Sequence, residues 1–135
     1  MPDLPKLSLL PERYAVCRLP LDADLPEWLG AAMMQDTFWS LTRAIGEVSA
    51  VVAESFAPPS TDEIPVKSGW RILQVEGPLP FEMVGVLAGL VVPLADAQVS
   101  VFTISTYNTD YLLVQETALP VALAALHDAG YSVVR

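Results

Sequence analysis

Few residues of this sequence are of a type that could carry out chemistry on a bound substrate. His127 is the only histidine and Cys17 the only cysteine, which excludes an internal disulfide and a zinc site built from such ligands. No glycine-rich phosphate loop and no nucleophile turn around a serine occurs. We expect His127 near the end of a helix, where the helix dipole favours it, and Cys17 as a small core residue of a strand. The sequence therefore predicts a protein without catalytic activity, cofactor or metal.

A first candidate binding segment is Glu76–Leu87, which passes from the end of a predicted strand into a predicted helix. A helix start offers unpaired backbone N–H groups and a partial positive charge, and both suit a carboxylate ligand. Gly85 would let a ligand or a neighbouring backbone approach closely. The alternative is that this glycine only permits tight packing of the helix on a sheet.

A second candidate segment is Ser105–Tyr111, in which seven consecutive residues carry polar side-chain groups between two apolar strands. A simple hairpin needs about two turn residues, so the excess favours a loop with a binding task. Asp110 could hold an ammonium or guanidinium group there. In the alternative interpretation, Asn108 and Asp110 only bond the backbone of their own turn.

These two segments carry a resemblance to a known family. Leu79–Leu87 followed by Ile104–Val114 resembles the small bacterial proteins with two ACT domains, which are related to the regulatory domains of aspartate kinases and to the animal cytosolic arginine sensors. The stretch Ser-Thr-Tyr-Asn-Thr-Asp-Tyr at 105–111 is its most specific part, and the resemblance covers nearly the whole chain.

The resemblance implies an amino-acid site, because ACT domains bind amino acids at the start of the first helix and at domain interfaces. Residue by residue, it implies a ligand site with two walls, formed by Phe81, Val84, Gly85 and Val86 on one side and by Ser105, Thr106 and Asp110 on the other. The chain departs from the family at Pro80-Phe81-Glu82, where Asp-Phe-Ser is frequent, and Glu82 places a negative charge near the expected carboxylate.

The second half of the chain must position both walls, and its pattern alternates between strand and helix. The order β-α-β-β-α-β is the ferredoxin-like arrangement. The predicted elements are a strand at Trp70–Glu76, a helix at Phe81–Ala95, strands at Val99–Ser105 and Asp110–Glu116, a helix at Pro120–Ala129 stopped by Gly130, and a strand at Tyr131–Val134.

The first half repeats part of this order. A shift of 63 positions places Phe38-Trp39 on Val101-Phe102, and a strand precedes each copy. The predicted elements are a proline-containing arm at 1–12, strands at Arg13–Leu19, Thr37–Arg43 and Val48–Glu54, a short helix at Glu27–Met33 and a linker at Ala57–Asp62. We interpret the chain as an α+β protein of two ferredoxin-like (βαββαβ) ACT modules with antiparallel sheets. Residues 1–64 form a degenerate module that lacks its second helix, and residues 65–135 form the C-terminal ACT domain.

Composition limits the partners. Hydrophobic residues make up 53% of the chain and the net charge is −9, which predicts a packed core and argues against nucleic acid and anionic membrane surfaces. No leader is evident, and the longest uncharged apolar run, Met83–Ala95, is shorter than a membrane span. We therefore expect a cytoplasmic protein. We also expect a homodimer, because the chain is unusually apolar for its size and small ferredoxin-like modules expose sheet edges.

Two functions follow from these patterns. The leading interpretation is a regulatory or sensor protein that binds an amino acid or a similar small molecule and shifts its conformation or partner affinity. The alternative is an interaction or assembly module that has kept the ACT fold and lost the ligand. Its sheet edges and the exposed aromatics among Tyr14, Trp28 and Trp39 would then serve assembly.

Overall fold

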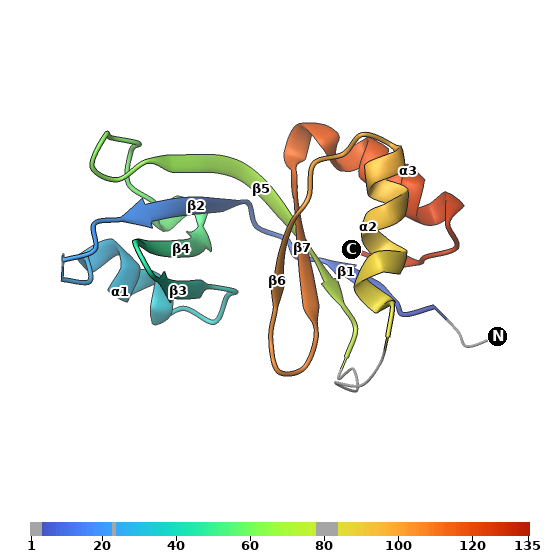
Figure 1. The fold of residues 1–135 in the computed structure, drawn as a ribbon, viewed down its shortest axis with the longest axis horizontal. Helices are drawn as coiled ribbons and strands as arrows, with labels where there is room; N and C mark the ends of the chain where they lie inside the picture. The colour runs from blue at the N-terminus through green and yellow to red at the C-terminus, as the bar shows by residue number, and fades with distance from the viewer. Residues whose placement is uncertain (1–3, 23, 78–83) are drawn as a thin grey trace. The chain divides into compact units, whose positions relative to one another are not determined.

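The computed structural model describes residues 4–22, 24–77 and 84–135, and it divides the chain into two compact units (Figure 1). One comprises Glu12–Gly69, and the other comprises Met1–Pro11 together with Trp70–Arg135. We call them the inserted unit and the split unit, after their places in the sequence. Strand β5, Val66–Val75, runs across the division, which falls after Gly69. The expected boundary between residues 64 and 65 lies just before this strand.

The split unit has the predicted β-α-β-β-α-β order from residue 70 onward, which confirms the ferredoxin-like class. Its strands are arranged in the order β6-β7-β5-β1-β8. The elements are β1 (Leu7–Leu9), the end of β5, α2 (Val86–Asp96), β6 (Phe102–Ser105), β7 (Asp110–Gln115), a 3-10 turn η2 (Glu116–Ala118), α3 (Leu119–Asp128) and β8 (Val133–Val134).

Strand β1 corrects the prediction that residues 1–12 form an arm. Leu7 is fully buried, and β1 lies between β5 and β8, antiparallel to the first and parallel to the second. The parallel pair also departs from the expected purely antiparallel sheet. Pro5 and Pro11 lie outside the strand, so neither removes a donor from the ladder, and the Leu7 N–H bonds the Ser132 carbonyl at 2.9 Å.

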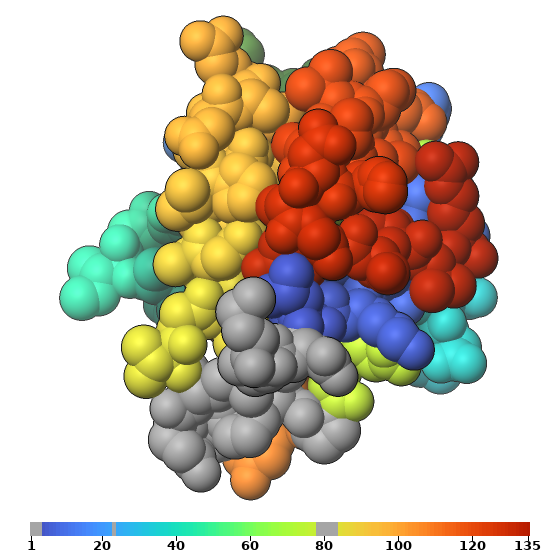
Figure 2. Space-filling model, turned by 90° about the vertical axis from the view of Figure 1, so that its right-hand side faces the viewer, coloured from blue at the N-terminus to red at the C-terminus, as the bar shows by residue number. Residues whose placement is uncertain are grey.

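Helices α2 and α3 lie side by side in the split unit, as Figure 2 shows in yellow to orange and in orange-red. Each helix buries its apolar stripe completely, at Leu90 and Leu94 in α2 and at Ala122 and Leu126 in α3. The core of the unit consists of Leu7, Leu73, Val75, Leu90, Leu94, Val99, Leu112, Val114, Leu119, Ala122, Leu126 and Tyr131.

Both helices end with the same backbone motif. After α3, the Gly130 N–H bonds the His127 carbonyl and the Tyr131 N–H bonds the Leu126 carbonyl. After α2, Gln98 and Val99 make the equivalent bonds to Ala95 and Leu94. This is the Schellman pattern, whose first residue beyond the helix is left-handed, and the φ angles are 99° at Gly130 and 59° at Gln98. The predicted stop at Gly130 is confirmed.

The inserted unit contains strand, helix, strand, strand, a 3-10 turn and a final strand segment, in the sheet order β3-β4-β2-β5. Helix α1 has the predicted bounds. The elements are β2 (Tyr14–Leu19), α1 (Glu27–Met33), β3 (Ser40–Ala44), β4 (Glu47–Ala53), η1 (Glu54–Phe56) and residues 66–69 of β5. Between β4 and β5 the chain, fully described there, forms no α-helix.

The inserted unit has its own core on one face of its sheet. That core consists of Ala15, Cys17, Leu19, Leu29, Ala32, Ala50 and Val52. Tyr14 is only 1% exposed and its ring meets the edge of Phe38, so the expectation that it is an exposed aromatic is wrong. Trp28 is half-buried, while Trp39 is exposed. Tyr14 is buried because it begins β2 and pairs with Ala53 in the middle of the sheet.

Candidate functional site

The polar turn between β6 and β7 is tied together by its own side chains. Ser105 and Asp110 face each other across the strand pair, and the Ser105 hydroxyl donates to Asp110 Oδ1 at 2.6 Å. The Thr106 N–H donates to the Thr109 carbonyl at 2.8 Å, and the Thr106 hydroxyl reaches the same oxygen at 3.1 Å. The structure thus brings Ser105, Thr106 and Asp110 together in one hydrogen-bonded turn.

Asp110 keeps some capacity for a ligand. Its side chain is half-buried at the start of β7, and only Oδ1 receives the serine bond. Oδ2 has no hydrogen-bond donor within the described parts of the chain. A carboxylate in this setting can accept a charge-assisted hydrogen bond from an ammonium or guanidinium group.

Thr109 anchors this turn, although the sequence analysis did not place it among the site residues. It is the one buried polar residue among those the structure describes, and its hydroxyl donates to the Val75 carbonyl at 2.6 Å. Val75 is the last residue of β5, so the bond fixes the turn at the end of that strand. No sequence signal separates Thr109 from Thr106, which is also a threonine but is exposed in the same turn.

Helix α2 begins without a side-chain cap among the described residues. Gly85 is its N-cap and adopts a left-handed conformation with φ of 84°, which glycine tolerates and other residues rarely adopt. A Cβ at this position would meet no described atom within 4 Å, so close packing on the sheet does not account for the glycine. No acidic residue lies in the first turn of α2. Its first N–H groups therefore remain suited to an anionic ligand.

The remaining residues of the helix wall are placed unequally. Val84 is 94% exposed and Val86 is half-buried at the first turn of α2. Phe81 lies outside the described residues, and so does Glu82. Figure 1 shows the β6–β7 turn and the start of α2 at the same end of the split unit, the end at which β5 finishes.

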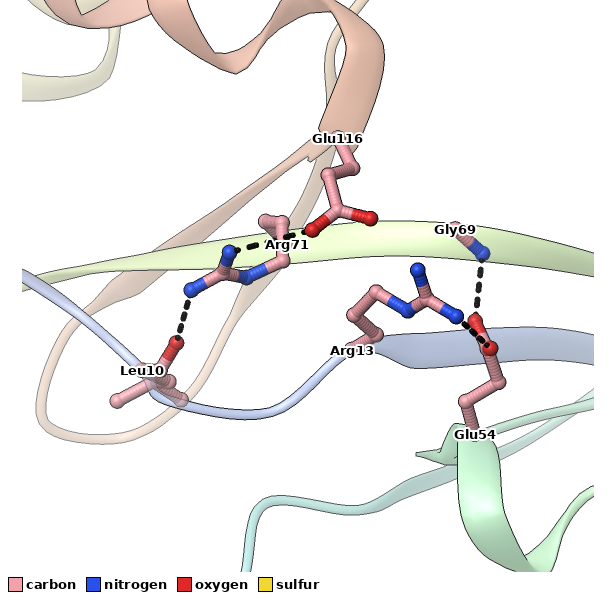
Figure 3. A network of polar contacts seen from close by, with 6 residues as sticks. All are labelled: Leu10, Arg13, Glu54, Gly69, Arg71 and Glu116. Carbon is pink, nitrogen blue, oxygen red and sulfur yellow. Dashed lines mark hydrogen bonds and ion pairs between the residues drawn. The ribbon is translucent and has the colours of Figure 1, made fainter.

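Two arginines outside both walls organise polar networks, one in each unit (Figure 3). In the split unit, Arg71 donates to the Leu10 carbonyl at 3.2 Å and lies 3.6 Å from Glu116. In the inserted unit, Arg13 donates to Glu54 at 2.8 Å, and the other oxygen of Glu54 accepts the Gly69 N–H at 2.9 Å. The arginines therefore hold neighbouring backbone segments within each unit.

Neither His127 nor Cys17 lies in a setting that suggests reactivity. His127 is exposed in the last turn of α3, as the dipole argument predicts. Cys17 is fully buried in β2, which confirms its role as a small core residue. Burial raises the pKa of the Cys17 thiol to about 11, so it stays protonated at neutral pH.

Comparisons with known proteins agree with this fold. Residues 65–128 match the family model of the ACT domain. The human cytosolic arginine sensor for mTORC1, subunit 1, is 34% identical over 88 residues, a match that covers 62% of this chain and 27% of that protein. The human protein CASTOR3P is 32% identical over 93 residues, covering 62% of this chain and 57% of that protein. The chain thus spans only part of these relatives.

Solved structures are similar over almost the whole chain. A protein from Agobacterium tumefaciens has a TM-score of 0.84 and 28% identity, covering 98% of this chain and 94% of that one. The regulatory subunit of aspartate kinase from Thermus flavus has a TM-score of 0.66 and 10% identity, covering 95% and 99%. The second likeness shows the fold alone. In the described residues, no helix has the length and apolar character of a membrane span. Residues 65–128 therefore match an ACT domain, the chain is similar in sequence to the human cytosolic arginine sensor, and it shares its fold with the regulatory subunit of aspartate kinase.

Proposed function

We propose that this protein is a non-catalytic regulatory protein that binds a free amino acid at the end of the split unit where β5 finishes. The observation that carries the proposal is the uncapped start of α2, which lies at the same end of the unit as the half-buried Asp110. The amino-acid carboxylate would accept hydrogen bonds from the first N–H groups of α2. Its ammonium or a cationic side chain would pair with Asp110.

The known relatives support a regulatory role. The human relative is named as an arginine sensor, and one structural neighbour is the regulatory subunit of a kinase. A binding protein of this kind needs no reactive side chain, since a ligand regulates through its different affinities for two states. The amino acid bound by this chain need not be that of the relative, because the match covers 27% of the sensor.

We further propose that the inserted unit is a degenerate second ACT module and that the protein is a homodimer. The order of elements in the inserted unit, strand-helix-strand-strand, supports the second module.

The outer strands β3 and β6, each at an end of its sheet order, support the homodimer, because unpaired edges are sites for pairing with another chain. Sedimentation equilibrium at micromolar concentration tests the dimer.

One observation favours the alternative of an assembly module without a ligand. The Ser105 hydroxyl already bonds Asp110, and a turn of this kind is stable without any bound molecule. Met34 and Ile45 are also strongly exposed in the inserted unit, which suits contact with another protein.

A binding experiment with Asp110→Asn separates the two functions. A thermal-shift screen with the twenty amino acids identifies the ligand, since a true ligand raises the melting temperature by mass action. Calorimetry with that amino acid should show the affinity of Asp110→Asn reduced at least about thirtyfold, which corresponds to about 2 kcal/mol for a lost charge pair. Asparagine can still accept the Ser105 bond, so the fold should be retained.

Asp128→Asn is the matched control, because Asp128 is an exposed carboxylate at the end of α3. This variant should bind the amino acid with the same affinity as wild type. No stabilisation by any amino acid would favour the assembly module, whereas equal affinity in wild type and Asp110→Asn would remove Asp110 from the binding site. Gly85→Ala is a weaker test of ligand binding, although Gly85 lies at the start of α2. The left-handed conformation makes any side chain there cost about 1–2 kcal/mol of stability, whatever the ligand does.

A further inference from the structure

The helix layer of the inserted unit is incomplete. The split unit covers its sheet with α2 and α3, which have eleven and ten residues. In the inserted unit the described residues form a single α-helix, α1, with seven residues (Figure 1). Phe56, Ala57 and Ile64 pack against the core of this unit, but the fully described chain between β4 and β5 forms no α-helix. The second helix of the β-α-β-β-α-β order is therefore missing from this layer.

An apolar groove lies on the same face of this sheet as α1. Its floor is formed by Leu19, Leu41 and Val48, which extend from β2, β3 and β4 and belong to or pack against the core of the unit. Leu19 pairs with Val48 in the sheet register, so regular strand pairing sets the floor. This part of the groove is a hollow of about 330 Å³. Its walls are also largely apolar and include Leu21, Leu25, Pro26 and Ile64.

The groove continues toward the turn between β3 and β4. A second hollow shares Leu21 and Arg43 with the first and extends to Ile45. From Leu41 to Ile45 the chain advances by about 13 Å, at about 3.3 Å per strand residue. An α-helix of about nine residues, or two and a half turns, has this length.

Large apolar side chains are exposed along this groove. The exposed fractions are 47% at Leu21, 57% at Leu25 and 106% at Ile45. Single exposed apolar residues are common on protein surfaces, but a group of them along one groove is typical of an interaction site.

The groove is surrounded by carboxylates. The segments that supply its lining, residues 19–27, 41–48 and 61–64, contain six acidic residues and one basic residue, Arg43. Asp24 and Glu63 line the first hollow, and Asp22 follows Leu21. These three carboxylates and Arg43 are exposed, and none makes an ion pair or side-chain hydrogen bond with another described residue. The rim is therefore net acidic and favours a cationic partner.

We propose that this groove binds an amphipathic helix of a partner protein, whose apolar face lies in the groove and whose flanks carry lysine or arginine. Apolar side chains at positions i, i+4 and i+7 of that helix would contact Leu19, Leu41 and Val48, as in other complexes of a helix in a groove. Its lysine or arginine side chains would pair with Asp24 and Glu63. The partner helix would thus add to a helix layer that this chain leaves incomplete.

Charge and length favour this occupant over two others. A second copy of this chain carries a net charge of −9, so it would bring further carboxylates to an acidic rim. A free amino acid would cover only part of a groove that extends from Leu25 to Ile45.

The inference does not rest on the amino-acid site proposed at Gly85 and Asp110, because all residues of the groove lie in the inserted unit. The two proposals can therefore fail separately. The probe is a synthetic peptide of about four helical turns, with leucine at i, i+4 and i+7 and lysine on both flanks. The matched peptide has glutamate in place of every lysine.

The peptides are titrated into the full chain and followed by methyl NMR and circular dichroism. The lysine peptide should shift the methyl signals of Leu19, Leu41 and Val48 and gain helix on binding, because an isolated helix of this length is only marginally stable. The glutamate peptide should bind at least about tenfold more weakly, because its charges repel the rim.

Two variants test the rim and the apolar surface. Asp24→Asn combined with Glu63→Gln should weaken binding of the lysine peptide about tenfold. Asp96→Asn combined with Asp128→Asn is the matched control, because it changes the net charge equally at two exposed residues of the split unit, and its affinity should equal that of wild type. Ile45→Ala should weaken binding at least about fivefold, because less apolar area is buried. Val121→Ala, at a similarly apolar and exposed residue of α3, should not.

Four results would overturn the proposal. The first is the absence of methyl shifts in the inserted unit with the lysine peptide. The second is an equal loss of affinity in the two double variants, which would assign binding to net charge rather than to position. The third is a shift of the same three methyl signals by free amino acids alone, which would assign the groove to a small ligand. The fourth is a homodimer that dissociates in Ile45→Ala by sedimentation, which would assign the groove to a second copy.

Discussion

The two units share a local device and then diverge. In each, a strand ends in a 3-10 turn that begins with a glutamate, and that glutamate pairs with an arginine in the strand that leads to the unit's first helix, or in the position just before that strand. The pairs are Arg13–Glu54 in the inserted unit and Arg71–Glu116 in the split unit (Figure 3). This equivalence supports the interpretation of the chain as a repeat more directly than the loose sequence match does.

The residues after the turn differ between the two units, and only the split unit has a second helix there. Pro120 follows Leu119 in the first turn of α3, where proline is tolerated because its missing N–H has no partner in a helix anyway. The inserted unit also has a proline there, Pro58, but Pro59 follows it. The helical region is disfavoured for a residue before a proline, so the second proline counts against a helix start at this position.

The largest expected effect tests whether the first half can stand alone. A fragment of residues 1–64 should show no cooperative thermal transition and little dispersion in its NMR spectrum. The fragment lacks all of β5, which pairs with both β1 and β2, so each of those strands loses a neighbour. A cooperative melt of this fragment would contradict the view that β5 holds the inserted unit together.

A smaller effect tests the assignment of the N-terminal strand to the split unit. Leu7→Ala should lower the free energy of unfolding by about 2–5 kcal/mol, because it opens a cavity in a core formed mainly by residues after Trp70. Leu4→Ala, three residues earlier and 47% exposed, should cost less than about 1 kcal/mol. Urea denaturation measures both. Similar losses in the two variants would mean that β1 contributes little to the core.

The smallest expected effects are changes in the free energy of unfolding at the ends of the two helices of the split unit. Gln98→Gly should raise the free energy of unfolding by about 1 kcal/mol, because glycine adopts the left-handed conformation without the strain that a side chain causes. Gly130→Ala should lower it by about 1–2 kcal/mol for the same reason. Thermal and urea unfolding of both variants check the pair. A destabilised Gln98→Gly would show that the glutamine side chain has a role of its own.

Most elements of this fold were predictable because local patterns determine them. Helix α1 has its predicted bounds, and α3 lies within one residue of the prediction at each end. The apolar spacing predicted a helix at Phe81–Ala95, but α2 begins at Val86, because Gly85 is its left-handed N-cap. The strand Leu7–Leu9 was missed, because three residues between prolines give little local signal and the strand depends on β5 and β8. The start of β5 at Val66 was missed for the same reason, since Lys67, Ser68 and Gly69 do not favour a strand by themselves.

The candidate site was predictable in its residue types but not in its contacts. The polar stretch marked the turn at Ser105–Asp110, yet no sequence pattern pairs the Ser105 hydroxyl with Asp110 or aims Thr109 at Val75. The sequence places Gly85 near a predicted helix start. That this position requires a positive φ follows only from the path of the backbone into α2.

The parallel pairing of β1 with β8 also has a consequence for synthesis on the ribosome. Leu7 aligns with Val133, so the sheet of the split unit is completed by residues 126 positions apart in the sequence. Strand β5 is translated before α2, so β1 can pair with it early, but the other edge of β1 waits for β8 with its backbone groups unpaired. At about 5–20 residues per second this wait lasts several seconds, far longer than a hairpin needs to form. The nascent protein therefore carries β1 without its β8 neighbour until Val133 and Val134 leave the exit tunnel, and contacts this distant in sequence slow the completion of the sheet.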